Sequence, residues 1–228
     1  MTLQHVDQLF RLIVFLFAIS VHESAHAWMA NRRGDPTARM LGRVTLNPLK
    51  HIDPVGTVLL PLIALYSNFP MIGWAKPTPV DPRNFKNLVL DDILTSVVGP
   101  ISNFLVAICA LVALSLIKLS SPAGQQIVSG IPYGMISPEM NSALVPLSLL
   151  LYELMSINII LGVFNLIPVP PLDGSHVLRH FLPPNALRVY DTVGMFALMA
   201  LVFLGGGLLN KLFSPVVGIF NYILLLRI

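Results

Sequence analysis

Long apolar stretches dominate this chain, and short polar stretches separate them. Three of the apolar stretches, at residues 9–30, 93–117 and 144–167, can each cross about 30 Å of hydrocarbon, which takes roughly 20 helical residues. Two more follow near the end of the chain, at about 193–209 and 216–226. The pattern therefore predicts an all-α membrane protein, a multi-pass helical bundle with about five spans.

The apolar stretch at residues 55–66 differs from the others because it is too short to cross a bilayer as a helix. Pro54 precedes it and Pro61 interrupts it. The flanking residues 41–46 and 73–80 are rich in turn formers and partly β-like. We therefore expect a short re-entrant or β-hairpin segment after the first span.

The composition supports the membrane prediction. Of the 228 residues, 55% are apolar and 11% are charged, whereas a soluble domain carries about 25% charged residues. The net charge is +3, but the basic residues flank apolar stretches and form no block, so we expect no nucleic-acid partner. If residues 55–66 turn back, most of the 14 Lys and Arg residues, Arg227 included, lie on one side. The positive-inside rule makes that side cytosolic, and we expect the membrane to be the cell membrane.

The first predicted span contains a chemical motif in the sequence SVHESAHAW. Its residues His22, Glu23 and His26 match HExxH, and the two histidines share one helix face because they are four residues apart. Imidazoles are zinc ligands, and a catalytic zinc activates a water molecule from which the glutamate takes a proton. Two core histidines and a stray glutamate are the alternative. A charged group inside a bilayer costs about 3 kcal/mol or more, so the motif indicates function instead.

A catalytic zinc site needs a third protein ligand, and the sequence offers Asp173 in FNLIPVPPLDGSH. Pro168, Pro170 and Pro171 remove backbone donors, so the preceding span must unwind there. Irregular backbone at membrane depth lies against protein or lines a wet cavity. Taken alone, this segment fits a polar loop beyond the span equally well. Together with HExxH, it predicts a site for one Zn²⁺ ion.

The pair HESAHAW and NLIPVPPLDG resembles the signature motifs of the site-2 protease family of intramembrane zinc metalloproteases. The stretches LNPLKHIDPVGT, GWAKPTPVDPRNF and GPISN resemble its compact members, and the resemblance covers about residues 9–174. It implies that His22, His26 and Asp173 are zinc ligands, that Glu23 is the catalytic base, and that the metal lies toward the cytosolic side.

The length and the lack of internal repeats suggest one unit. We expect a single transmembrane metalloprotease domain over residues 1–228, with a core at about 9–180 and C-terminal spans at about 190–228. There is no room for the PDZ or CBS domain that many relatives carry, so we expect the compact type.

Two asparagines are candidates for substrate binding. By the resemblance, Asn165 is the motif asparagine near the zinc, where it would hold the substrate backbone or the developing oxyanion. Asn103, in GPISN, is expected either to bind substrate or to support the site. Asn158 is on the same helix face as Asn165 and fits an interhelical hydrogen bond better. Glu153 is expected near the outer face, in a structural or gating role. Of the other histidines, His51 and His176 are not expected to bind the ion, and His5 and His180 are expected to be solvated.

We expect a zinc metalloendopeptidase that cleaves peptide bonds in or near transmembrane segments of membrane-bound substrates, as in regulated intramembrane proteolysis. The β-like residues 41–46 and 73–80 would pair with the unwound substrate as an added strand. A membrane metal transporter is an alternative, but it gives Glu23 no task. An inactive protease-like scaffold is another, against which the complete motif argues. The expected partners are a transmembrane protein substrate and the lipid bilayer, and an oligomer is left open.

Overall fold

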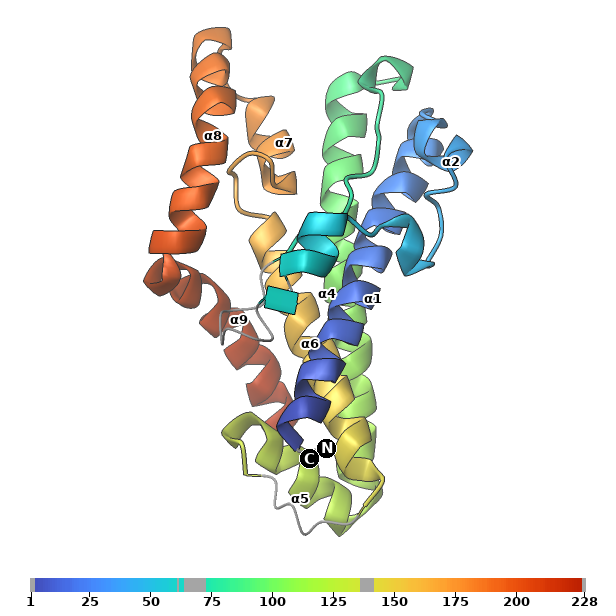
Figure 1. The fold of residues 1–228 in the computed structure, drawn as a ribbon, viewed down its shortest axis with the longest axis vertical. Coiled ribbons are helices and arrows are strands. Elements are labelled where there is room, and N and C mark those ends of the chain that lie inside the picture. The colour runs from blue at the N-terminus through green and yellow to red at the C-terminus, as the bar shows by residue number, and fades with distance from the viewer. Residues whose placement is uncertain (1–2, 61, 64–72, 136–141, 227–228) are drawn as a thin grey trace.

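The computed structural model describes residues 3–60, 62–63, 73–135 and 142–226, and Figure 1 shows their arrangement. The long helices are α1 (Leu3–Arg33), α4 (Leu88–Ser120), α6 (Leu144–Asn165), α8 (Pro184–Leu204) and α9 (Gly206–Leu225). The short elements are α2 (Thr37–Met40), η1 (Pro48–Lys50), η2 (Pro54–Leu59), η3 (Pro82–Asn84), α5 (Pro122–Gly130), η4 (Ile131–Tyr133) and α7 (Asp173–Arg179).

Five helices in the described ranges are long and apolar enough to cross a membrane: α1, α4, α6, α8 and α9. Their mean hydropathy runs from 1.4 in α1 to 2.3 in α4. Large apolar side chains face outward, among them Phe203 at 68% and Leu204 at 85% exposure. Such surfaces are costly in water but not in lipid. The prediction of an all-α protein is confirmed, and the five expected apolar stretches correspond to five helices that could span a membrane.

The β-hairpin is not confirmed. The described residues contain no strand, and residues 41–46 form a turn and a bend. Residues 73–81, which we call the strap, run extended beside α1 (Figure 1). The predicted re-entrant segment is described only in part, because residues 61 and 64–72 lie outside the described residues.

Helix α4 begins at Leu88, five residues before the predicted span. The Asn87 side chain caps it by accepting a hydrogen bond from the Leu90 backbone N–H at 3.1 Å. The hydropathy pattern did not include this first turn in the predicted span, because the turn contains the charged residue Asp91. In the structure Asp91 is buried, and the Arg33 Nε donates to its Oδ1 at 2.5 Å. This ion pair joins the end of α1 to the start of α4.

Helices α1, α4 and α6 form the core of the bundle, since each packs against the other two (Figure 1). Helix α4 runs antiparallel to α1 and α6 (Figure 1). Small residues on α4 bring α6 close, and α9 packs against the same cluster. The cluster consists of Ala107, Ala110, Leu111, Leu114, Val128, Met155, Ile159 and Leu224.

Helices α8 and α9 run in the same direction along this core (Figure 1). Helix α8 starts beside α7, where Arg179 pairs with Asp191 at 3.0 Å. Helix α9 ends beside the end of α4, where the Lys118 ammonium donates to the Leu224 and Leu226 carbonyls at 2.7 Å each. We expected the end of the chain to lie with the basic loops. Arg227 is outside the described residues, but Leu226 lies at the Lys118 end, because both C-terminal helices run toward it.

Candidate metal centre

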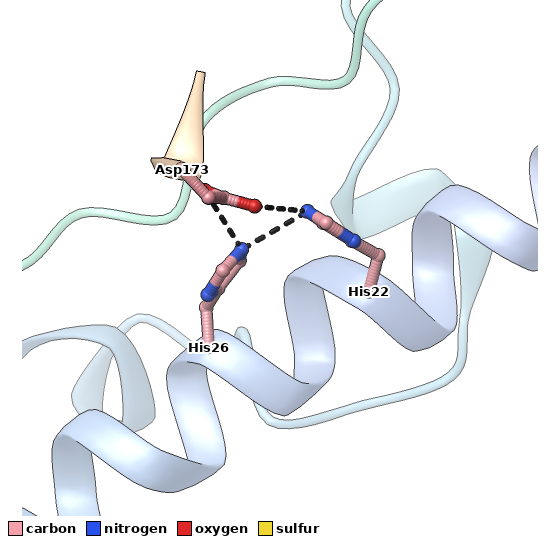
Figure 2. Close-up of side chains that lie close together, drawn as sticks. All are labelled: His22, His26 and Asp173. Atoms are coloured by element: carbon pink, nitrogen blue, oxygen red, sulfur yellow. Dashed lines mark hydrogen bonds and ion pairs between the residues drawn. The ribbon is translucent and has the colours of Figure 1, made fainter. Parts of the chain in front are cut away.

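The two motif histidines lie one turn apart on α1 and point in the same direction (Figure 2). Both are buried, at 7% exposure for His22 and 8% for His26. Their Nε2 atoms are 3.0 Å apart. The helical spacing predicted this shared face, and the structure shows it.

Asp173 faces the two rings from the first residue of α7 (Figure 2). Its Oδ2 lies 3.1 Å from the His22 Nε2, and its Oδ1 lies 3.4 Å from the His26 Nε2. The structure therefore brings together the three residues that the sequence proposed as ligands, although 147 positions separate His26 from Asp173.

The proline-rich turn after α6 delivers Asp173 to this place. Helix α6 ends at Asn165, and residues 166–172 form bends and turns before α7. A Cβ on Gly174 would lie 2.6 Å from the Leu166 carbonyl carbon, so only glycine lets α7 pack this closely on the turn. The Tyr190 hydroxyl of α8 donates to the Pro168 carbonyl at 3.0 Å and braces the turn from outside.

Helix α7 is also held from its other end. Asp92, near the start of α4, lies 2.7 Å from the His180 Nε2 and 3.4 Å from the His176 Nδ1. These contacts give both histidines a structural task. Neither belongs to the His22, His26 and Asp173 cluster. His180, which we expected to be solvated, is instead largely enclosed, with a side-chain exposure of 15%.

The far side of each motif histidine is hydrogen-bonded. The His26 Nδ1 lies 2.6 Å from the Thr95 carbonyl, which can only accept, so the proton is on Nδ1. The His22 Nδ1 lies 2.6 Å from the Asn103 Oδ1. Such partners fix the tautomer and leave the Nε2 lone pair for a metal.

The residues fit a zinc ion. Two imidazole nitrogens and one carboxylate oxygen are a set found in catalytic zinc sites. Ligands at 2.0–2.1 Å in a tetrahedron are about 3.3 Å apart, and the donor separations here are 3.0, 3.1 and 3.4 Å. The Asp173 Oδ2 is buried and accepts no hydrogen bond from the described protein atoms. Two facing Nε2 lone pairs and this oxygen are therefore suited to share a cation.

Helix α4 forms the wall behind the histidines. A Cβ added to Gly99 would overlap the His26 Nε2 and would lie 2.5 Å from the His26 Cε1 and 2.7 Å from the His22 Cε1. These distances are far below the ordinary contact of about 3.5–4.0 Å between carbon atoms. The position therefore requires a glycine for α4 to approach the rings.

Glu23 lies on α1 beside the ligands and is held by Thr78 of the strap. The Thr78 backbone N–H donates to the Glu23 Oε2 at 2.8 Å, and the Thr78 hydroxyl lies 2.6 Å from the same oxygen. The sequence pattern indicated residues 73–80 as a β-like segment but did not point to Thr78. The available signal was its position between Pro77 and Pro79, which makes its N–H the only backbone donor of that tripeptide.

A buried arginine supports this part of the strap. Arg43 is 5% exposed, and its guanidinium donates to the Lys76 carbonyl and, at 3.1 Å, to the Pro77 carbonyl. Burial lowers the pKa of Arg43, and the negative charge of Glu23 acts against that change. Arg43 therefore brings a positive charge near Glu23 while its protons hold the strap.

Asn103 supports His22 in this structure. It is fully buried, and its Nδ2 donates to the Asn158 Oδ1 at 2.8 Å and to the Ala18 carbonyl at 3.3 Å. Of the two roles that the sequence left open, these contacts favour support of the site. Asn158 takes part in an interhelical hydrogen bond, as expected.

Two other predicted residues make hydrogen bonds or ion pairs with residues outside the cluster. The Asn165 Nδ2 donates to the Leu161 carbonyl of its own helix at 3.0 Å, and substrate binding by Asn165 stays a prediction. Glu153 pairs with Arg11 at 3.3 Å, nearer the start of α1 than the motif histidines are. That place agrees with a structural or gating role.

A membrane-spanning helix with a buried HExxH motif, facing a carboxylate from a proline-broken turn, defines a membrane metalloprotease of the zinc-dependent class. The model of peptidase family M50 matches residues 10–205. The chain belongs to this family, which is the site-2 protease family that the motifs resemble.

The names of two curated relatives also describe zinc metalloproteases. The chain is 36% identical over 174 residues to "Putative zinc metalloprotease YwhC" of Bacillus subtilis, covering 76% of this chain and 69% of that protein. It is 26% identical over 191 residues to "Putative zinc metalloprotease Rip2" of Mycobacterium tuberculosis H37Rv, covering 83% and 64%. The chain thus spans about two thirds of the length of these relatives. No solved structure matches the chain significantly.

Proposed function

We propose that this protein is an intramembrane zinc metalloprotease, which hydrolyses peptide bonds within or near transmembrane segments of membrane-bound proteins. The observation that carries the proposal is the place of the cluster on α1. At about 1.5 Å per residue, His22 lies roughly 16 Å along the helix from its end at Arg33. The reactive groups would then lie inside the hydrocarbon layer, which is about 30 Å thick.

His22, His26 and Asp173 would hold one Zn²⁺ ion. When bound, the ion would lower the pKa of a coordinated water to about 7 and polarise the carbonyl of the scissile peptide bond. Glu23 would accept the proton of the attacking water and pass it to the leaving amine. Asn103 and the Thr95 carbonyl would keep the imidazoles oriented through their Nδ1 protons.

The substrate helix has to unwind before a peptide bond reaches these groups, because helical carbonyls are hydrogen-bonded and shielded. The strap lies beside Glu23 and offers extended backbone to such a segment. Pro77 and Pro79 have no N–H, so this stretch would mainly accept hydrogen bonds from the substrate. We infer that the substrate supplies most of the donors when it pairs here.

We infer further that the site faces the cytosol of a cell membrane and serves regulated intramembrane proteolysis. The basic residues at the end of α1 and in the loop after it support this orientation, because they gather at the end of α1 nearer the cluster: Arg32, Arg33, Arg39, Arg43 and Lys50. We propose that the described helices act as one domain, since the cluster joins α1 and α7 and is walled by α4.

The experiment uses the purified protein in liposomes with a model transmembrane substrate. The wild type should contain one zinc per chain and cleave the substrate, and Glu23→Gln should keep the zinc but lose cleavage. Cleavage by Glu23→Gln at the wild-type rate would refute the mechanism. Zinc flux into the liposomes without cleavage would instead indicate a transporter, and zinc without either activity would indicate an inactive scaffold.

A further inference from the structure

In the described part of the chain, the Glu23 carboxylate accepts hydrogen bonds from one residue of another segment, and that residue is Thr78. The Thr78 hydroxyl lies 2.6 Å from the Glu23 Oε2 and 3.0 Å from the Glu23 carbonyl. A hydroxyl has one hydrogen to donate, and the shorter distance assigns it to Oε2. With the backbone N–H at 2.8 Å, Oε2 accepts two hydrogen bonds, while Oε1 accepts none from the described residues.

The strap is fixed on both sides of this contact. Before it, Arg43 holds two successive carbonyls, and the Lys76 N–H donates to the His51 carbonyl at 2.8 Å. His51 is itself fully buried, and its Nε2 lies 2.8 Å from the Thr45 carbonyl. The strap is therefore fixed just before Thr78.

The strap is also anchored after the contact. The Asp81 N–H donates to the Asp35 Oδ2 at 2.8 Å, and the Asn84 side chain donates to the Asp35 Oδ1 at 2.9 Å. Burial acts to raise the pKa of Asp35, but hydrogen bonds from Thr37, Asp81 and Asn84 lower it. The loop after α1 thus anchors the strap, and the strap brings Thr78 to Glu23.

We propose that Thr78 is the positioning residue of the general base, in that it occupies Oε2 and leaves Oε1 to take the proton. This inference rests on the proposed function. A glutamate side chain turns about three bonds and samples several staggered rotamers. Two hydrogen bonds to one oxygen select a single rotamer, so the other oxygen is presented in one direction. Arg43 acts one step further away, because it sets the position of Thr78.

The test compares two substitutions at Thr78 in the zinc-loaded protein. Thr78→Val keeps the backbone N–H and removes the hydroxyl, and kcat should fall about 10- to 100-fold, the usual loss for a supporting residue. KM and zinc content should not change, because the hydroxyl bonds to Glu23 and not to the ligands, and valine keeps the strap backbone that would pair with the substrate. Thr78→Ser restores the hydroxyl and should restore most of kcat. Thr192→Val, which removes a hydroxyl bonded to the Arg188 carbonyl on exposed α8, is the matched control and should cleave like the wild type.

A second readout uses the metal-free protein and no activity. Thr78→Val should lower the thermal midpoint when Glu23 is present, and should lower it less in a Glu23→Ala background. Equal shifts in both backgrounds would overturn the pairing. A Thr78→Val protein with wild-type kcat, or a Thr78→Ser protein as slow as Thr78→Val, would overturn the positioning role.

These outcomes separate the two proposals. If the wild type cleaves no transmembrane substrate, the proposed function fails, while the thermal cycle still decides whether Thr78 holds Glu23. If the wild type cleaves and the Thr78 variants cleave equally well, the inference fails and the function stands.

Discussion

Gly99→Ala is the substitution whose effect the structure defines most directly. The new methyl group would lie 2.5 Å from the His26 Cε1 and 2.7 Å from the His22 Cε1. Ordinary contact needs about 3.5 Å, so the rings or α4 must move by about 1 Å. Metal sites tolerate errors of only about 0.2 Å in ligand distances. Overpacking of this kind costs about 1–3 kcal/mol, which corresponds to zinc binding roughly 5- to 150-fold weaker.

The assay is a titration of the purified variant against a competing zinc chelator. Gly218→Ala on α9 is the matched control, because a Cβ at that position meets nothing within 4 Å and zinc affinity should stay unchanged. The thermal midpoint of the metal-free protein reports whether Gly99→Ala still folds. If the folded variant binds zinc as tightly as the wild type, α4 does not press against the histidines as described.

Four further results are expected. Asn103→Leu removes the acceptor of the His22 Nδ1 and should weaken zinc binding about 10- to 100-fold in the same titration, and unchanged affinity would remove Asn103 from the support of the site. Asp92→Asn weakens the charged contacts that hold α7, so both zinc affinity and the thermal midpoint should fall, and a variant equal to the wild type in both would contradict this. A strong chelator should abolish cleavage of a model substrate and added zinc should restore it, whereas cleavage that survives full zinc removal would exclude a metalloprotease. In a background without Cys109, the single variants Ser120→Cys and Leu226→Cys should be labelled by an impermeant reagent from the same side of the membrane. Arg83→Cys should be labelled from the other side. Labelling of Ser120→Cys and Leu226→Cys from opposite sides would mean that α8 and α9 cross the membrane separately.

The sequence predicted the spans well where they are uniformly apolar and less well where polar residues begin a helix. Helix α4 starts at Leu88 because Asn87 caps it and Asp91 forms an ion pair with Arg33, 58 positions away in the sequence. The course of α8 and α9 was missed for a related reason. Hydropathy measures whether a helix can lie in lipid, but it carries no information about the direction in which the next helix runs.

The ligand set was accessible from the sequence because each part has local chemistry. An i, i+4 histidine pair shares a helix face whatever surrounds it, and prolines break a helix wherever they occur. The support of the site was less accessible. The amide of Asn103, the Thr95 carbonyl and the Gly99 backbone meet the histidines only because α4 packs against α1.

The amino-acid sequence by itself determined that the chain lies in a membrane, that one helix presents two imidazoles and a carboxylate, and that a second carboxylate follows a broken span. These properties depend on hydropathy and backbone geometry within a few residues. The tertiary structure decided which groups hold them in place, above all the contact between Thr78 and Glu23. That contact joins residues 55 positions apart and depends on hydrogen bonds between the strap and Arg43, His51 and Asp35, which no local pattern encodes.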